Sequence, residues 1–300
     1  MCEQDSFRDE VLASGLLVSL GVPGVFGRSG IFEGVVEAFQ RCFEEAGAHH
    51  DAEVIRFPPV FARKHYVRFN HVHLFPHLMG SVHTFTGKER DHMALVGRLE
   101  GGEDWTDGLA PADAMLIPAA CYPLYPTLAG TLPEGGRVVD LRSFVFRHEP
   151  SEDLARMQIF RQREYVRIGS AEQAQSHRDE WIERGLGLLR GLGLPVEAVV
   201  ANDPFFGRGG RMAGASQREQ ELKYELVVPI TSEEKPTAIA SSNLHLDVFG
   251  QNFGIHTADG AVAHTSCVGF GLERVTLALF KTHGVDPSAW PQALRSQLDL

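Results

Sequence analysis

The sequence is short of cysteine, of basic residues and of long apolar runs. Its four cysteines lie far apart, without the CxxC pairs or the density of a disulfide-stabilised secreted domain. Lys plus Arg number 28 and Asp plus Glu number 39, which gives a formal charge of −11 with histidines neutral, so the broad basic surface of a nucleic-acid-binding protein is missing. These absences favour a reducing, cytoplasmic compartment and argue against nucleic acid as the partner.

Signals for membranes and for export are also missing from the sequence. No run approaches the roughly 20 apolar residues that a membrane-spanning helix requires. Residues 1–30 place acidic residues before a short apolar stretch, whereas a secretory signal needs a basic start and a longer apolar core. We therefore expect a soluble, unprocessed chain, with an N-terminal extension over 1–30 and one domain over 31–300.

Apolar periodicity and turn residues predict the elements of that domain. Apolar residues recur every three or four positions over 31–46, which predicts an amphipathic helix that ends at Gly47. Residues 52–69 predict a short strand and a prolyl turn, while 137–149 and 158–170 predict an antiparallel pair around a polar loop. A capping-box pattern at Ser170 and Gln173 predicts a helix that ends near Gly191.

The C-terminal half continues with further strands and a final helix. Alternation predicts strands within 196–201, 222–230 and 236–249, and then a strand-to-helix segment over 269–284. Helices separated by groups of strands indicate an α+β fold, an antiparallel sheet flanked by helices, because a parallel sheet would alternate single strands with helices.

Two patterns carry residue types suited to a nucleotide. In GFGLER (269–274), the glycines permit close backbone approach and Arg274 can make bidentate bonds to phosphate. In FRHE (146–149) and the strand that follows, Arg147 can bind phosphate and Phe160 can lie under a base, with Arg156 nearby. A plain strand-to-helix turn and a solvated sheet face remain the alternatives for each pattern alone.

Together the two patterns resemble motifs 2 and 3 of class II aminoacyl-tRNA synthetases, especially the seryl branch. The matching residues are Phe146, Arg147, Glu149, Arg156, Phe160 and Glu164 for motif 2, and Gly269, Gly271, Glu273 and Arg274 for motif 3. Residues 31–59 look like motif 1, whose helix usually builds the family's dimer interface. The resemblance implies a class II synthetase-like fold, ATP with Mg²⁺, and a homodimer.

The long coiled-coil arm with which seryl-tRNA synthetases grip tRNA has no counterpart in this sequence. A core of this kind is similar to the amino acid:[carrier protein] ligases, which are homologues of atypical zinc-dependent seryl-tRNA synthetases, and residues 75–87 look like that group. The resemblance implies activation of glycine or alanine to an aminoacyl-adenylate and transfer to the phosphopantetheine thiol of an acyl or peptidyl carrier protein, without tRNA. A truncated seryl-type tRNA synthetase and a non-catalytic amino-acid- or nucleotide-binding paralogue are the alternatives.

The resemblance also implies roles for individual residues in ATP binding. Arg147 would lie near the α-phosphate and Arg274 near the departing pyrophosphate, as the catalytic pair. The remaining ATP-binding residues would be Glu149, Arg156, Phe160, Ser242 and Asn243. The glutamate that the seryl branch commonly places before its serine-rich strand is missing, since Thr237 or Ala238 stands there, so Mg²⁺ is expected to arrive mainly with ATP.

The resemblance further implies a zinc ion held by Cys121, Glu164 and Cys267. Their distance in sequence gives no metal signature, and buried apolar thiols are the alternative. Two thiolates and a carboxylate would leave a fourth zinc position open for the amino group of the substrate. Five histidines within 65–83 form a weaker metal candidate, interpreted mainly as surface and pocket wall.

The stretch 203–223 is interpreted as an exposed, partner-binding insertion. Carrier domains are usually acidic, so docking on an acidic enzyme needs a local basic patch. The candidate residues are Arg208, Arg211, Arg218 and Lys223. A solvated loop whose charges bind nothing specific is the alternative.

Overall fold

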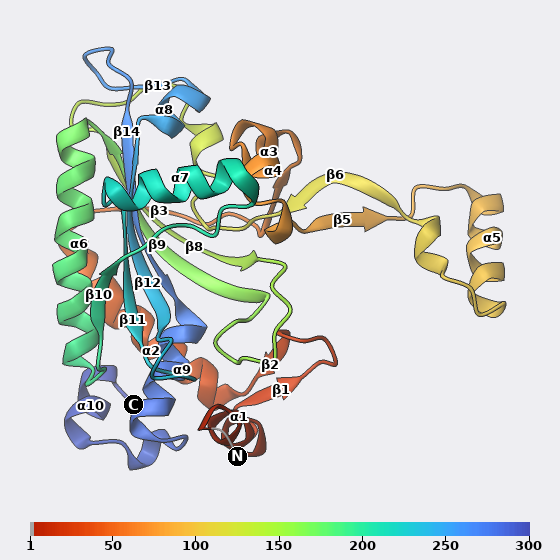
Figure 1. Ribbon diagram of the computed structural model, residues 1–300, viewed down its shortest axis with the longest axis horizontal. Coiled ribbons are helices and arrows are strands. Elements are labelled where there is room, and N and C mark those ends of the chain that lie inside the picture. Colours follow the sequence, from red (N-terminus) through yellow and green to blue (C-terminus); the bar gives the residue numbers. More distant parts are fainter. Residues whose placement is uncertain (1–2) are drawn as a thin grey trace.

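A seven-stranded sheet forms the centre of the molecule, which we describe for residues 3–300 from a computed structural model (Figure 1). The strand order is β10-β11-β12-β14-β9-β8-β3, and every neighbouring pair is antiparallel except β3 with β8. The strands are β3 (Glu53–Ile55), β8 (Arg137–Phe146), β9 (Ile159–Gly169), β10 (Glu197–Val200), β11 (Lys223–Val228), β12 (Thr237–Leu246) and β14 (His264–Gly271). The predicted α+β fold with an antiparallel sheet is confirmed.

Three helices cover one face of this sheet: α2 (Gly30–Gly47), α6 (Ala171–Gly191) and α9 (Leu272–His283). The apolar stripe of α2 carries Phe39 and Phe43 into the core, where their ring centroids lie 5.6 and 4.8 Å from that of Phe270 on β14. The predicted capping box at Ser170 is present, with both reciprocal hydrogen bonds to Gln173. Local signals thus placed both helices correctly.

The N-terminal segment packs on the same core. Helix α1 (Glu3–Ala13) and the hairpin of β1 (Leu17–Ser19) and β2 (Phe26–Arg28) bury Phe7, Val11 and Leu16 against it. The turn of this hairpin also contacts motif 2, because the Gln158 amide donates to the Gly24 carbonyl at 2.8 Å. Cys2 lies outside the described residues.

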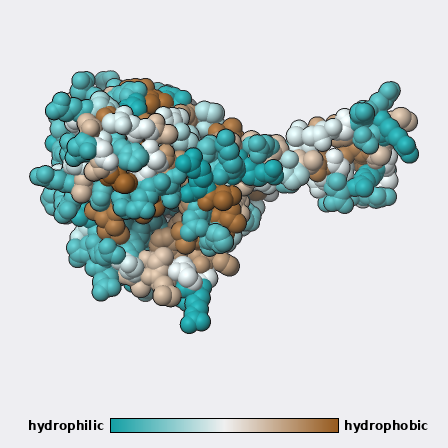
Figure 2. Space-filling view, turned by 90° about the horizontal axis from the view of Figure 1, so that it is seen from above, coloured by the Kyte–Doolittle hydropathy of each residue, from teal (hydrophilic) through white to brown (hydrophobic). Residues whose placement is uncertain are grey.

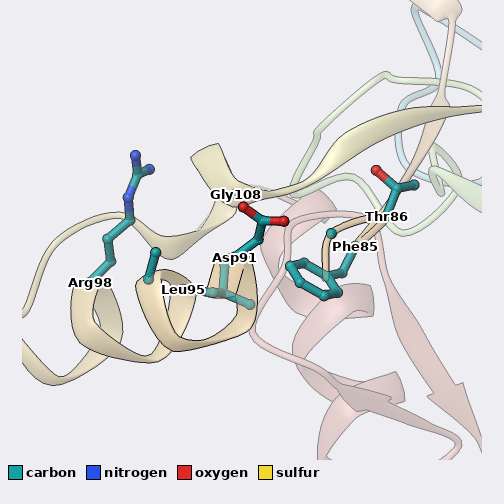
Figure 3. Close-up of a pocket in the computed structure, with 8 residues that line it drawn as sticks. Phe85, Thr86, Asp91, Leu95, Arg98 and Gly108 are labelled. Atoms are coloured by element: carbon teal, nitrogen blue, oxygen red, sulfur yellow. The ribbon is translucent and has the colours of Figure 1, made fainter. Parts of the chain in front are cut away.

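A narrow arm leaves the body between motifs 1 and 2. Strand β4 (Val60–Ala62) and a long ribbon of β5 (Ser81–Thr84) and β6 (Ala110–Leu116) form a separate sheet that carries α5 (Glu89–Glu100) and η3 (Trp105–Gly108) away from the body (Figures 1 and 2). No residue of α5 is buried. A pocket of about 280 Å³ between α5, residues 85–87 and Gly108 belongs to the arm alone (Figure 3). The sequence patterns did not predict this arm.

The remaining helices and strands complete the chain. They are η1 (Ala48–His50), α3 (Lys64–Arg68), α4 (His71–Leu74), η2 (Pro76–Leu78), η4 (Tyr125–Thr127), β7 (Gly130–Thr131), α7 (Gly207–Glu219), α8 (Val248–Phe253), β13 (Ile255–His256), η5 (Pro287–Ala289) and α10 (Gln292–Leu298). Within residues 3–300, none of the helices combines the length and the apolar character needed to cross a bilayer.

Candidate active site

The candidate residues converge on the sheet face that α2, α6 and α9 leave uncovered. Side chains directly opposite each other in neighbouring strands share a face. The register pairs Glu225 with Ser241, Ser241 with Gly269 and Gly269 with Glu164, and it pairs Asn243 with Cys267. Four strands therefore contribute to one continuous floor.

One end of this floor holds a compact group made by Cys121, Glu164 and Cys267. Their candidate ligand atoms all lie within 4.8 Å of one another, and each residue is at most 5% exposed. Glu164 Oε1 accepts a hydrogen bond from the Ala120 amide at 3.0 Å, whereas Oε2 is buried without a partner in the described part of the chain. The resemblance had implied this trio, and the fold brings it together from a loop and two strands.

Electrostatics within the group favour a charged sulfur on Cys267. A hydrogen bond from the Cys121 thiol lowers the pKa of Cys267, and the same bond raises the pKa of Cys121. Asn243 Nδ2 lies 3.4 Å and His245 Nε2 lies 3.6 Å from Cys267 Sγ. Burial raises the pKa of Glu164 to about 7.

This donor set fits a zinc ion held by three protein ligands. Two sulfurs and one carboxylate oxygen are typical zinc donors, and three of them leave a coordination position for a small molecule. The orphaned Glu164 Oε2 supports that interpretation, because a buried carboxylate oxygen without a partner is costly. Cys42, the other described cysteine outside this group, is buried in the apolar core.

The other end of the floor gathers arginines around Phe160. The guanidinium carbons of Arg147 and Arg274 each lie 5.6 Å from the centroid of the Phe160 ring. Arg147 Nε donates to the Pro118 carbonyl, and Arg274 donates to the Ala155 and Ala238 carbonyls at 2.7 and 2.9 Å. Backbone contacts thus hold both cations in place.

Positive charge is concentrated at this end. Burial, followed by repulsion from Arg147, lowers the pKa of Arg274 to about 10. The nearby Arg156 is exposed and pairs with Glu149 at 3.1 Å. Crowded guanidinium groups that face a sheet floor can bind a polyanion such as the triphosphate of ATP.

Two residues assigned from the sequence do not face the site as expected. Ser242 is 2% exposed and donates to the Arg178 carbonyl in α6, on the opposite face of the sheet, because successive strand residues alternate. Lys223 is 8% exposed and pairs with Asp203 and Glu225 at 2.7 and 2.9 Å, so it cannot belong to an exposed basic patch. The assignments of Ser242 to ATP and of Lys223 to docking are therefore wrong.

Strand alternation could have found the residues that the sequence patterns missed. Counting by two from Asn243 reaches Ser241, whose Oγ accepts from Asn243 Nδ2 at 3.1 Å, and His245, which contacts Cys267. Glu225, opposite Ser241, adds a carboxylate to this floor besides that of Glu164. Among residues 3–300, none of the five histidines within 65–83 belongs to a group of three or more metal-ligating side chains whose ligand atoms lie within 4.8 Å of one another. These histidines therefore do not form a ligand set.

The stretch after β10 forms helix α7, which presents exposed basic residues. Arg208, Arg211 and Arg218 are exposed, and Asn202 accepts a hydrogen bond from Arg218. Two apolar side chains, Phe206 and Met212, are 56% and 71% exposed beside them. The helix therefore has a mixed basic and apolar surface that can contact a protein partner.

The sequence is similar to proteins whose names are known. Two proteins of Bradyrhizobium diazoefficiens, named amino acid–[acyl-carrier-protein] ligases 1 and 2, are 45% and 46% identical to this chain; each match covers 96% of it and 89% and 87% of the relatives. A type-2 serine–tRNA ligase of Methanopyrus kandleri is 28% identical over 62% of this chain and 38% of its own. No family model matches the sequence.

Solved structures share the fold at low identity. The M. kandleri SerRS, in a complex with A. aeolicus tRNASec, superimposes with a TM-score of 0.81 at 21% identity, over 100% of this chain and 60% of that one. A cytoplasmic serine–tRNA ligase from Naegleria fowleri with AMP gives 0.70 at 14% identity, over 98% and 65%. The class II synthetase-like fold is thereby confirmed.

Proposed function

The chain belongs to the amino acid–[acyl-carrier-protein] ligases, and from this we propose that it activates a small amino acid with ATP and transfers the aminoacyl group to a carrier-protein thiol. The observation that carries the proposal is the single sheet floor, with an amino-acid end at Cys121, Glu164 and Cys267 and a phosphate end at Arg147 and Arg274. Glycine or alanine is the proposed substrate.

The first step joins the two ends of the floor. An oxygen of the substrate carboxylate attacks the α-phosphorus of Mg²⁺-bound ATP, the bond to pyrophosphate breaks, and an aminoacyl-adenylate forms. Arg147 neutralises charge at the α-phosphate and Arg274 at the departing pyrophosphate, while Phe160 positions adenine and Glu149 its amino group. Backbone carbonyls already hold both guanidinium groups, so little reorganisation is needed as charge develops.

The second step delivers the aminoacyl group to sulfur. The phosphopantetheine thiol of the carrier attacks the carbonyl carbon of the adenylate, a thioester forms, AMP leaves and the thiol proton passes to solvent. The nucleophile comes with the carrier, so the enzyme's buried thiols are not required for this step.

Cys121, Glu164 and Cys267 are the proposed zinc ligands. Bound zinc would supply an open coordination position for the neutral amino group of the substrate. The Ala120 amide orients Glu164, while Asn243 and His245 orient the sulfur of Cys267. We expect about one zinc per chain in purified protein, and loss of zinc together with amino-acid selection in Cys267→Ser; active protein without metal would refute this assignment.

The proposed carrier-docking surface is the exposed face of α7, with Arg208, Arg211 and Arg218. The arm is a poorer candidate, because residues 81–116 carry three basic and seven acidic side chains and would repel an acidic carrier. Helix α7 itself holds three arginines and one glutamate.

We also propose a cytoplasmic homodimer. The buried cysteines 42, 121 and 267 are free thiols, which suits a reducing compartment. Strand β3 is an edge strand with Val54 63% exposed, and it follows the helix that resembles motif 1, so this edge is the proposed dimer surface. Light scattering on the wild type and on Val54→Lys tests it: a dimer that the variant weakens is expected, and a wild-type monomer would contradict it.

One pair of assays tests the function as a whole. Exchange of labelled pyrophosphate into ATP, measured with each of the twenty amino acids, should respond to glycine or alanine. Loading assays should then transfer that amino acid to a carrier protein bearing phosphopantetheine but not to the apo carrier, which is the matched control. Charging of tRNA would favour a truncated seryl-type synthetase, and absence of exchange would favour a non-catalytic paralogue.

A further inference from the structure

A second group of metal-ligating side chains lies on the helix-covered side of the sheet, away from the active site. His49 and His50 in η1 and Glu180 in α6 place their candidate ligand atoms within 4.8 Å of one another. His49 Nε2 is 2.6 Å from Glu180 Oε1, and His50 Nε2 is 4.0 Å from the same oxygen. None of these residues takes part in the proposed reaction.

A buried histidine faces the same region. His50, His177 and Glu180 line a pocket of about 300 Å³, and the rings of His50 and His177 lie 5.4 Å apart. His177 is 4% exposed; its Nδ1 is 3.1 Å from Ser266 Oγ, and its Nε2 is buried without a partner among residues 3–300. Ser266 precedes Cys267 on β14 and therefore points to the opposite face, so the pocket is separate from the zinc trio.

The chemistry of these donors selects a class of ion. Imidazole nitrogens with one carboxylate suit borderline transition metals, whereas Mg²⁺ and Ca²⁺ prefer sets of oxygen ligands.

We propose that His49, His50 and Glu180 form a second metal site, which binds a divalent transition-metal ion of the Zn²⁺ and Ni²⁺ class, with His177 at its inner wall. Metal binding would replace one contact that Glu180 makes now and one that His50 makes now. Arg184 Nη2 lies 2.8 Å from Glu180 Oε1, and Trp181 Nε1 donates to His50 Nε2 at 3.1 Å. An ion at this position therefore comes next to the indole of Trp181.

The test titrates the protein as purified, with zinc expected only at Cys121, Glu164 and Cys267, with Ni²⁺ and follows bound metal and tryptophan fluorescence together. Wild type should take up one Ni²⁺ per chain with quenching of fluorescence. His49→Ala and Glu180→Gln should weaken that uptake by at least about tenfold, since even outer-shell partners of a metal change affinity this much. His83→Ala removes an exposed histidine on the arm and is the matched control.

Two further results separate this site from the proposed zinc trio. Cys267→Ser should lose zinc yet keep the Ni²⁺ site and its quenching, whatever becomes of amino-acid activation. Thermal unfolding of each variant shows whether it remains folded. Unchanged Ni²⁺ uptake and quenching in folded His49→Ala and Glu180→Gln, or no uptake by wild type beyond the zinc trio, would overturn the proposal.

Discussion

At the scale of single residues, Arg147 and Arg274, the two arginines proposed for catalysis, differ in how they are held. Arg274 donates to carbonyls of both the motif 2 loop and β12, whereas Arg147 donates to the carbonyl of Pro118, three residues before the proposed zinc ligand Cys121. The two arginines therefore connect the phosphate end of the floor to different segments of the chain.

We expect Arg147→Ala and Arg274→Ala each to lower pyrophosphate exchange by about 10²- to 10³-fold, the usual cost of one lost charge-stabilising donor. Arg90→Ala, an exposed arginine on the arm, is the control and should exchange normally. Retention of more than about a tenth of wild-type exchange by either folded variant would argue against a phosphate role, given that same cost.

His71 gives a prediction about pH. It is 2% exposed, and burial, with repulsion from Arg147, lowers its pKa from 6.5 to about 4. Because the pKa of His71 is higher in the unfolded chain, the unfolded chain binds the proton first as the pH falls. The contribution of neutral His71 to the free energy of unfolding is therefore fully present above about pH 6.5. It is lost as the pH falls toward 4, at about 1.4 kcal/mol per pH unit.

Urea unfolding of wild type and His71→Gln across pH 4 to 7 checks this, with pH 7 as the reference. The variant should be less stable at pH 7 but should lose less stability on acidification. Since the other histidines contribute equally to both proteins, parallel pH slopes would show that His71 does not carry the effect.

The sequence predicted the place of a site residue correctly where motif 2 or motif 3 contains that residue. Arg147, Phe160 and Arg274 come together as their motifs imply. Ser242 failed because a strand sends alternate side chains to opposite faces, and no motif says which. Lys223 failed because the predicted insertion 203–223 overlapped the predicted strand 222–230, and Lys223 is in fact the first residue of β11, buried against Asp203.

At the scale of elements, α7 is bound to the body mainly by polar contacts and by small residues. Its only buried residues are Gly210 and Gly214, and an added Cβ at Gly210 would lie 2.8 Å from the Phe205 carbonyl carbon. Gln217 bonds to both the amide and the carboxylate of Asp203, which in turn pairs with buried Lys223. Contacts at α7 are thus linked to the site floor through Glu225.

Reversing the charges of α7 tests its docking role. Arg208→Glu with Arg211→Glu should slow loading of the carrier and weaken the salt dependence of loading, but leave pyrophosphate exchange unchanged. Arg90→Glu with Lys235→Glu makes the same change in net charge at exposed positions elsewhere and should load normally. Equal loading by both double variants would place the docking surface elsewhere.

At the scale of the molecule, elements that depend on local sequence signals could be predicted, whereas features that depend on contacts between distant segments could not. Helices α2 and α6 were predictable because periodicity and capping are local signals. The trio of Cys121, Glu164 and Cys267 was not predictable from spacing, because a loop and two strands bring it together. The arm was missed because its outer helix buries nothing and so carries no strong apolar stripe.

The arm supplies the last prediction. Thr84 and Ala110 are cross-strand partners at the end of the β5–β6 ribbon, so residues 85–109 can be replaced by a two-residue Asn-Gly turn without moving either strand. Because α5 buries no residue and the ribbon keeps its pairing, thermal stability and pyrophosphate exchange should equal those of the wild type. Loss of exchange in the folded variant would mean that the arm supports the adenylation site. Intact exchange with lost carrier loading would instead move the docking surface from α7 to the arm, despite the arm's excess of acidic residues.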